Sequence, residues 1–163
     1  MAAEIRDKLV ITELTAEMKF DSFNCTNKKV NDFLKRNAIS NQEKLISRVY
    51  VYLNIENGDI AGFISLSAYR LNLADSEKYS INKIPAVLLS RLAIDEKYVG
   101  HNLGMDLLEY ASGICSKVKS LIGCRLLIIE VEKDDPVLEY FMNYGFKVER
   151  VKNFHYLSID LLE

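Results

Sequence analysis

Residues 89–108 read LSRLAIDEKYVGHNLGMDLL, and this stretch decides the fold. Up to Ile94 it is almost continuously apolar, which is typical of a central strand buried on both faces. Residues 100–104 predict a turn, and apolar residues at helical spacing then continue to Gly123. Such a turn aims the free N–H groups and the positive dipole end of the helix at one point. The stretch therefore predicts an anion site suited to phosphate, unless its glycines serve only to make the turn tight.

The flanking segments predict the rest of the framework. Strand patterns cover residues 9–14, 48–56, 59–71, 86–94, 125–131 and 155–161, and helical patterns cover 27–45, 103–123 and 136–144. Asn57-Gly58 predicts a type I′ hairpin turn, because Asn and Gly tolerate positive φ best. The polar residues 71–83 predict a loop, which either covers a sheet edge or lies over a substrate site. We expect one α/β (α+β) domain, residues 1–163, with a mixed, mostly antiparallel central sheet flanked by helices.

Composition excludes several classes of protein. The 163 residues are 49% hydrophobic and 27% charged with net charge −2, which excludes a mainly disordered chain and a polycation that coats nucleic acid. No apolar run reaches the roughly 18 residues of a membrane span, and no signal-peptide core is present, so we expect a cytoplasmic protein without a membrane partner. Three cysteines without metal-ligand spacing and two histidines predict reduced, mostly buried thiols and no metal site.

Two motifs in this framework resemble the GNAT superfamily of acetyl-CoA dependent N-acetyltransferases. The first runs from Leu92-Ala93-Ile94-Asp95 through the 100–104 turn to Leu107-Leu108, and the second is YFMNYGF at residues 140–146. The resemblance implies acetyl-CoA as cosubstrate, with its pantetheine arm on the 92–94 backbone and its pyrophosphate in the 99–105 loop. The cofactor-binding residues that it implies are Leu92, Ala93, Ile94, Val99, Gly100, His101, Asn102, Leu103, Gly104, Met105 and Phe141.

The loop departs from the family pattern at two positions. Val99 stands where the family usually has Arg or Gln, and Asn102 stands where it has Gly. Asn adopts the left-handed conformation more readily than other non-glycine residues, so the same loop path is expected. His101 would add positive charge near a phosphate when protonated, and the alternative is an ordinary surface-loop histidine.

The second motif departs from the family at Phe141, which aligns with a tyrosine that many GNAT enzymes use as a general acid. A phenyl ring cannot donate a proton, and Tyr144 lies on the same face of the predicted helix. We take Tyr144 as the candidate acid and Glu130 as the candidate base, with Asp95 as a further candidate base. The alternatives are solvent-facing carboxylates and a reaction that relies on positioning alone.

Within the superfamily, four segments resemble toxins of toxin–antitoxin modules that acetylate the amino group of aminoacyl-tRNA. They are residues 32–38, 42–48, 62–68 and 89–93. One segment is basic, with a local charge of +4, because Asp32 and Glu43 oppose six cations: Lys28, Lys29, Lys35, Arg36, Lys44 and Arg48. It either binds tRNA phosphates or is an ordinary solvated helix face.

Our main prediction is acetyl transfer to a primary amine of a small molecule or protein. The alternatives are acetylation of aminoacyl-tRNA, which makes tRNA a partner, and a noncatalytic acyl-CoA-binding module. The sequence identifies no specific amine acceptor, and it leaves a homodimer open.

Overall fold

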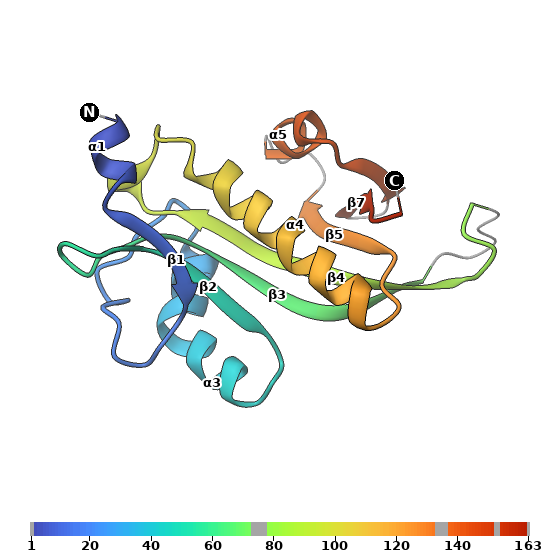
Figure 1. The fold of residues 1–163 in the computed structure, drawn as a ribbon, viewed down its shortest axis with the longest axis horizontal. Coiled ribbons are helices and arrows are strands. Elements are labelled where there is room, and N and C mark those ends of the chain that lie inside the picture. Colours follow the sequence, from blue (N-terminus) through green and yellow to red (C-terminus); the bar gives the residue numbers. More distant parts are fainter. Residues whose placement is uncertain (1, 73–77, 133–136, 152–153, 163) are drawn as a thin grey trace. The chain divides into compact units, whose positions relative to one another are not determined.

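The computed structural model describes residues 2–72, 78–132, 137–151 and 154–162. Its elements, drawn in Figure 1, are α1 (Ala2–Arg6), β1 (Leu9–Glu13), α2 (Lys28–Asp32), the π-helical turn η1 (Phe33–Asn37), α3 (Ala38–Glu43), β2 (Arg48–Asn54), β3 (Ile60–Asn72), β4 (Lys83–Ile94), the 3₁₀ turn η2 (Glu96–Tyr98), α4 (Leu103–Leu121), β5 (Leu126–Glu132), α5 (Val137–Tyr144), β6 (Lys147–Val151) and β7 (Phe154–Asp160). The strands follow the order β1-β2-β3-β4-β5-β7-β6. β4 and β5 pair in parallel, whereas β1–β2, β2–β3, β5–β7 and β6–β7 pair antiparallel. The predicted fold class, a mixed and mostly antiparallel sheet with helices, is confirmed.

The chain divides into two compact units. Unit 1 contains residues 1–66 and 91–111, and unit 2 contains residues 67–90 and 112–163. As a result β3, β4 and α4 each begin in one unit and end in the other. Within the described residues, no helix combines the length and the apolar character that crossing a membrane requires.

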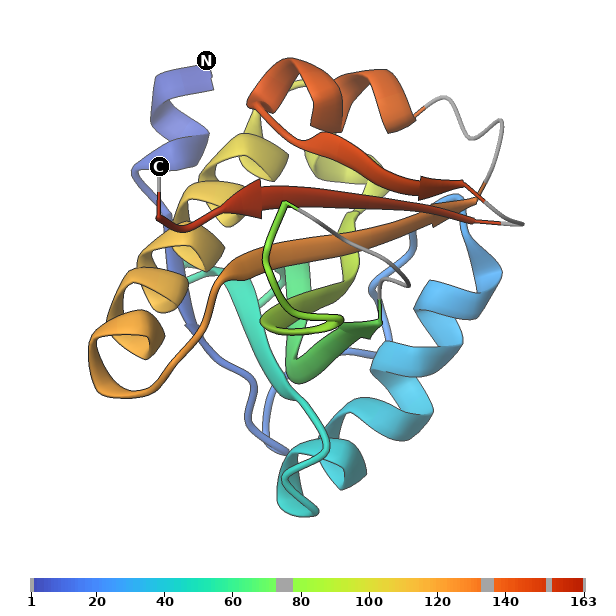
Figure 2. The ribbon, with the colours of Figure 1, turned by 90° about the vertical axis from the view of Figure 1, so that its right-hand side faces the viewer.

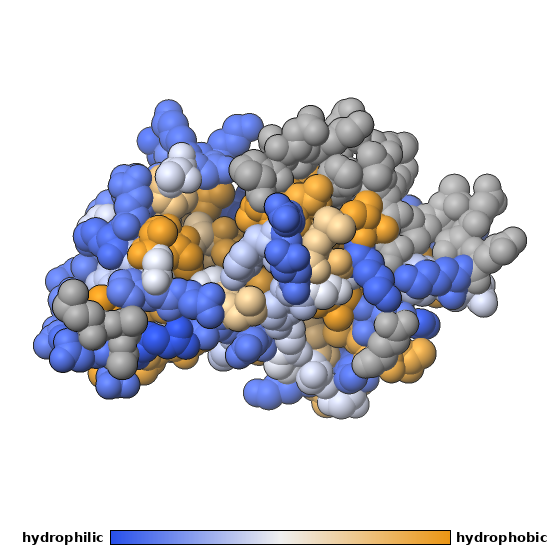
Figure 3. All heavy atoms as spheres, turned by 90° about the horizontal axis from the view of Figure 1, so that it is seen from above, coloured by the Kyte–Doolittle hydropathy of each residue, from blue (hydrophilic) through white to orange (hydrophobic). Residues whose placement is uncertain are grey.

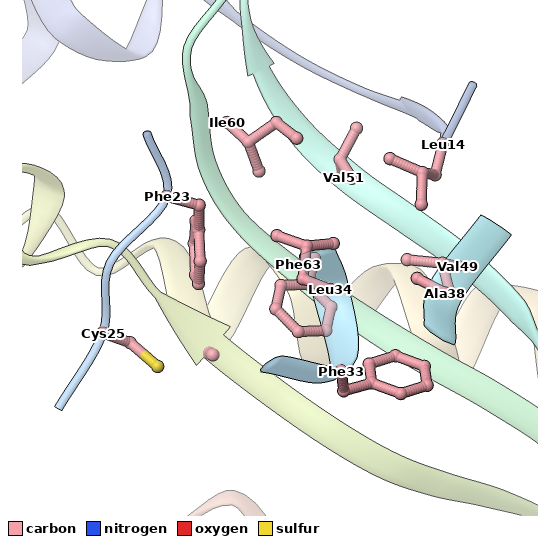
Figure 4. Close-up of a cluster of buried hydrophobic side chains, with 11 residues drawn as sticks. Leu14, Phe23, Cys25, Phe33, Leu34, Ala38, Val49, Val51, Ile60 and Phe63 are labelled. Carbon is pink, nitrogen blue, oxygen red and sulfur yellow. The ribbon is translucent and has the colours of Figure 1, made fainter. Parts of the chain in front are cut away.

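The core of unit 1 lies between its strands and the helical segment that runs from α2 to α3. Phe63 of β3 is fully buried, and its ring centroid lies 5.4 Å from that of Phe23 and 6.2 Å from that of Phe33. Figure 4 shows aliphatic side chains of the neighbouring strands around these rings. Aromatic pairs at such separations contribute about 0.5–1.5 kcal/mol beyond the area that they bury.

The helical segment was predicted as one helix over residues 27–45, and the structure modifies this prediction. Asn27 caps its start, because the Asn27 side-chain oxygen accepts the Val30 N–H at 3.3 Å. A π turn follows, in which the N–H of Ala38 donates to the Phe33 carbonyl five residues earlier. The helix ends at Glu43, so Leu45, which lies within the predicted range, is outside the helix and is 80% exposed with φ 57°.

Unit 2 is organised around β5, which pairs in parallel with β4 and antiparallel with β7. Figure 2 shows β7 beside both β5 and β6. The Arg125 guanidinium holds the Asp160 carboxylate with two hydrogen bonds of 2.6 and 2.8 Å. These bonds lower the pKa of Asp160. The pair therefore joins the start of β5 to the end of β7.

Several local predictions were wrong or incomplete. Only Gly58 has positive φ in the hairpin turn, and its N–H bonds to the Asn54 carbonyl, so the turn is longer than the predicted type I′ turn. β4 begins at Lys83, before Pro85, whereas the sequence placed its start after the proline. α1 and β6 were not predicted, because each has only five residues and lacks a marked apolar period. Residues 73–77 of the predicted 71–83 loop lie outside the described part of the chain.

Candidate functional site

The end of β4 packs directly against the backbone of β3 in unit 1. A Cβ atom added at Gly62 would lie 2.9 Å from the Ala93 carbonyl oxygen and 2.6 Å from a methyl group of Ile94. Only glycine therefore allows the two strands to approach so closely. Ala93 is 8% exposed, and Leu92 and Ile94 are partly exposed. All three implied pantetheine-binding residues thus lie at the end of one rigidly packed strand.

Asp95 follows β4 and has a structural role. Its two carboxylate oxygens accept the backbone N–H groups of Asn24 at 2.9 Å and Lys97 at 2.8 Å. The side chain caps η2, and the residue is 2% exposed. Both oxygens already accept hydrogen bonds, which favours this structural role, and the role of Asp95 as a base for an incoming amine stays a prediction.

The predicted phosphate loop contains two residues with positive φ. Gly100 has φ 93° and Asn102 has φ 60°, so Asn102 adopts the left-handed conformation expected of it. Val99 is 65% exposed, and α4 starts directly after the loop at Leu103. The first N–H groups of this helix have no acceptor within it, and its dipole is positive at this end. Gly104, expected in the turn, and Met105 both lie in the first turn of α4.

Polar side chains from three elements meet at the first turn of α4. The carboxylate of Asp106 lies 2.6 Å from the Arg6 guanidinium and accepts the Tyr52 hydroxyl at 3.0 Å. Arg6 also donates to the backbone carbonyl of His101 at 2.9 Å. Burial, followed by the hydrogen bond to Asp106, raises the pKa of Tyr52. The Nδ1 atom of His101 is buried and has no hydrogen-bond partner among the described residues.

The three remaining candidates lie in unit 2. Phe141 is 3% exposed, with its ring centroid 5.6 Å from that of Tyr140 and 5.7 Å from that of Phe146. Tyr144, at the end of α5, is partly exposed, and its hydroxyl lies 3.3 Å from the Ser112 hydroxyl. Glu130 is exposed on β5. Tyr144 therefore has a neighbour for proton exchange, whereas the side chain of Glu130 makes no hydrogen bond or ion pair within the described chain.

The basic segment of unit 1 keeps most of its charge exposed. Lys28, Lys29, Arg36 and Lys44 are exposed, and Lys35 is partly exposed. Arg48 is exposed as well, and it forms an ion pair with Glu13 at 3.1 Å. Figure 3 shows hydrophilic residues around smaller hydrophobic areas on the face that it draws.

Sequence reasoning missed two arginines of unit 1. Arg6 lies on the unpredicted α1, and no sequence signal connects it with a loop 95 residues away. Arg91 was predicted only as a member of a motif, without a role of its own. Its guanidinium carbon lies 3.8 Å from the ring centroid of Phe33, a cation–π contact, and burial lowers the pKa of Arg91.

The relatives found by comparison with known proteins include toxins. No family model matches the chain. It is 27% identical over 142 residues to a "tRNA-acetylating toxin" of Mycobacterium tuberculosis, covering 85% of this chain and 84% of the relative. It is 26% identical over 140 residues to the "Probable toxin TacT" of Sinorhizobium fredii, covering 77% of this chain and 76% of the relative.

Solved structures share the fold. AtaTR bound with acetyl-CoA superposes with a TM-score of 0.85 at 23% identity, covering 96% of this chain and 95% of that one. AtaT complexed with acetyl-methionyl-tRNAfMet superposes with a TM-score of 0.82 at 22% identity, covering 93% of this chain and 94% of that one. The predicted resemblance to GNAT acetyltransferases, and within them to the tRNA-acetylating toxins, is confirmed. The predicted enzyme class and cosubstrate agree with these relatives, which favour the tRNA alternative over the small-molecule or protein acceptor.

Proposed function

We propose that the chain is an acetyl-CoA dependent N-acetyltransferase that acetylates the amino group of aminoacyl-tRNA. The observation that carries this proposal is the loop of residues 99–102 with α4 behind it. Its two left-handed residues and the free helix N–H groups suit a pyrophosphate. The relatives supply the chemical class, because one is named for tRNA acetylation and a structural neighbour was solved with acetyl-CoA.

The proposed roles of the chain follow from the proton balance of the reaction. Acetyl-CoA supplies the acetyl group as a thioester, the amine nitrogen forms the new bond to the carbonyl carbon, and the bond to sulfur breaks. Glu130 takes the proton that the amine loses, and Tyr144 donates a proton to the departing sulfur. Tyr144 can recover a proton through the neighbouring hydroxyl of Ser112, 3.3 Å away.

A nucleic-acid acceptor agrees with the charge distribution of unit 1. The net charge of the whole chain is −2, yet the segment from Lys28 to Lys44 exposes four cations that have no carboxylate partner among the described residues. A local basic surface on an acidic protein favours phosphate binding at that place. The structural neighbours that include an antitoxin, such as AtaT bound to the C-terminus of AtaR, make a protein inhibitor a further expected partner.

Labelled acetyl-CoA tests the proposal directly. Incubation with aminoacyl-tRNA should transfer label to the tRNA fraction, and mild alkaline hydrolysis of the ester should release the label as N-acetylated amino acid. Deacylated tRNA is the matched control, because it has the same phosphates and bases but lacks the amino acid with its α-amino group. Label on polyamines or on protein lysines and none on aminoacyl-tRNA would restore the small-molecule or protein acceptor. Coenzyme binding without transfer to any amine would favour the noncatalytic module.

A further inference from the structure

We propose that Arg6 is a positioning residue for coenzyme binding, which fixes the phosphate loop and neutralises the carboxylate beside it. This inference rests on the proposed function, because it assumes that the loop of residues 99–102 receives the pyrophosphate. Figure 1 shows α1 beside the segment that leads into α4. The loop itself has Val99 where the family usually has a polar or charged residue, so its support comes from another element.

Arg6 fixes the direction of one peptide group in the loop. It donates from Nη1 to the carbonyl oxygen of His101 at 2.9 Å. A trans peptide is planar, so the N–H of Asn102 points away from that carbonyl. Holding the carbonyl of His101 therefore directs the N–H of Asn102 to the opposite side. This peptide joins His101 to Asn102, in the part of the loop that contains the two left-handed residues, Gly100 and Asn102. The backbone there can adopt many other conformations, so fixing one of them needs a specific contact.

Arg6 also changes the charge beside the loop. Asp106 lies in the first turn of α4, where a carboxylate stabilises the helix but repels a bound phosphate. The other guanidinium nitrogen of Arg6 lies 2.6 Å from this carboxylate, and the Tyr52 hydroxyl donates to the same oxygen. Arg6 thus reduces the repulsion between this carboxylate and a bound phosphate, while the carboxylate stays at the start of the helix. One guanidinium performs both tasks because its donors form a rigid fork.

The experiment compares Arg6→Met with the matched control Lys8→Met. Lys8 belongs to the same N-terminal segment and pairs with Glu56 at 2.7 Å, an exposed ion pair that does not touch the loop. Calorimetry measures the Kd of CoA, and kinetics compares acetyl-CoA with S-acetylpantetheine as acetyl donors. We expect Arg6→Met to raise the Kd of CoA about tenfold, equivalent to about 1.4 kcal/mol, and Lys8→Met to leave it within about twofold.

The donor comparison separates positioning from a general loss of structure. S-Acetylpantetheine lacks the pyrophosphate, so Arg6→Met should lower kcat/KM for acetyl-CoA and leave kcat/KM for S-acetylpantetheine unchanged. Unchanged CoA affinity, or equal losses with both donors, would overturn the inference and leave the proposed function standing. A wild-type protein that does not bind CoA would instead refute the proposed function and this inference together. Should Arg6→Met fail to fold, Arg6→Gln carries the same comparison.

Discussion

The substitution Phe141→Tyr tests whether this chain lacks a general acid at the position where many GNAT enzymes have one. The side chain is 3% exposed and is packed between the rings of Tyr140 and Phe146. A new hydroxyl that finds no partner there would cost about 1–3 kcal/mol of unfolding free energy. A hydroxyl that reaches the coenzyme sulfur would speed acetyl transfer, and a tenfold gain needs about 1.4 kcal/mol of barrier lowering.

Phe146→Tyr is the matched control, because Phe146 is also 3% exposed and belongs to the same ring cluster. Urea unfolding gives the stability of both variants, and single-turnover acetylation of aminoacyl-tRNA at saturating acetyl-CoA gives the chemical rate. We expect similar stability losses in both variants and a rate gain only at position 141, where the new hydroxyl would act as a second acid beside Tyr144. A flat or lower rate for Phe141→Tyr, with the protein still folded, would refute the idea that an acid at this position speeds the reaction and would leave Tyr144 as the proposed acid.

Three further predictions concern other parts of the chain. Gly62→Ala would place a Cβ 2.9 Å from a β4 carbonyl oxygen, and it should lower the urea-unfolding free energy by about 1–3 kcal/mol. Arg125 lowers the pKa of Asp160, so the Arg125–Asp160 pair should stabilise the protein fully above about pH 4 and lose this effect as the pH falls through the lowered pKa of Asp160. Asp160→Asn should therefore reduce the dependence of the unfolding free energy on pH in this acidic range, as measured by urea unfolding. Filter binding of aminoacyl-tRNA across a salt series gives the slope of log K against log salt, and the double variant Lys35→Ala with Arg36→Ala should reduce this slope by the equivalent of up to two phosphate contacts. An identical slope in the variant and the wild type would exclude this surface as the tRNA-binding site.

The strand, turn and helix around the candidate site were predictable because each has a strong local signal. The apolar run before Asp95 and the helical period after Asn102 depend on neighbouring residues, and the structure places β4 and α4 there. The left-handed Asn102 was also predictable, since few side chains tolerate that conformation. Local pattern therefore located the loop to within a few residues.

The supporting contacts were not predictable, because they join residues distant in sequence. Arg6 reaches a carbonyl 95 positions away, and α1 is too short for a period of its own. Asp95 has the sequence context of a free carboxylate, but the fold brings to it the N–H of Asn24, 71 positions away. Leu45 fitted the apolar spacing, but spacing does not indicate where a helix ends.

The π turn at residues 33–37 affects how this protein should be aligned with its relatives. A π turn holds one residue more than an α turn, so it amounts to a single-residue insertion that the helix has absorbed. Each added residue rotates the remainder of the helix by about 100°. For a relative whose helix lacks this π turn, an alignment without a gap here would match residues after the turn to positions on a different helix face. The basic surfaces of this protein and its relatives should therefore be compared on superposed backbones. Lys35 and Arg36 should be matched to the residues whose side chains point in the same direction, whatever their place in a sequence alignment.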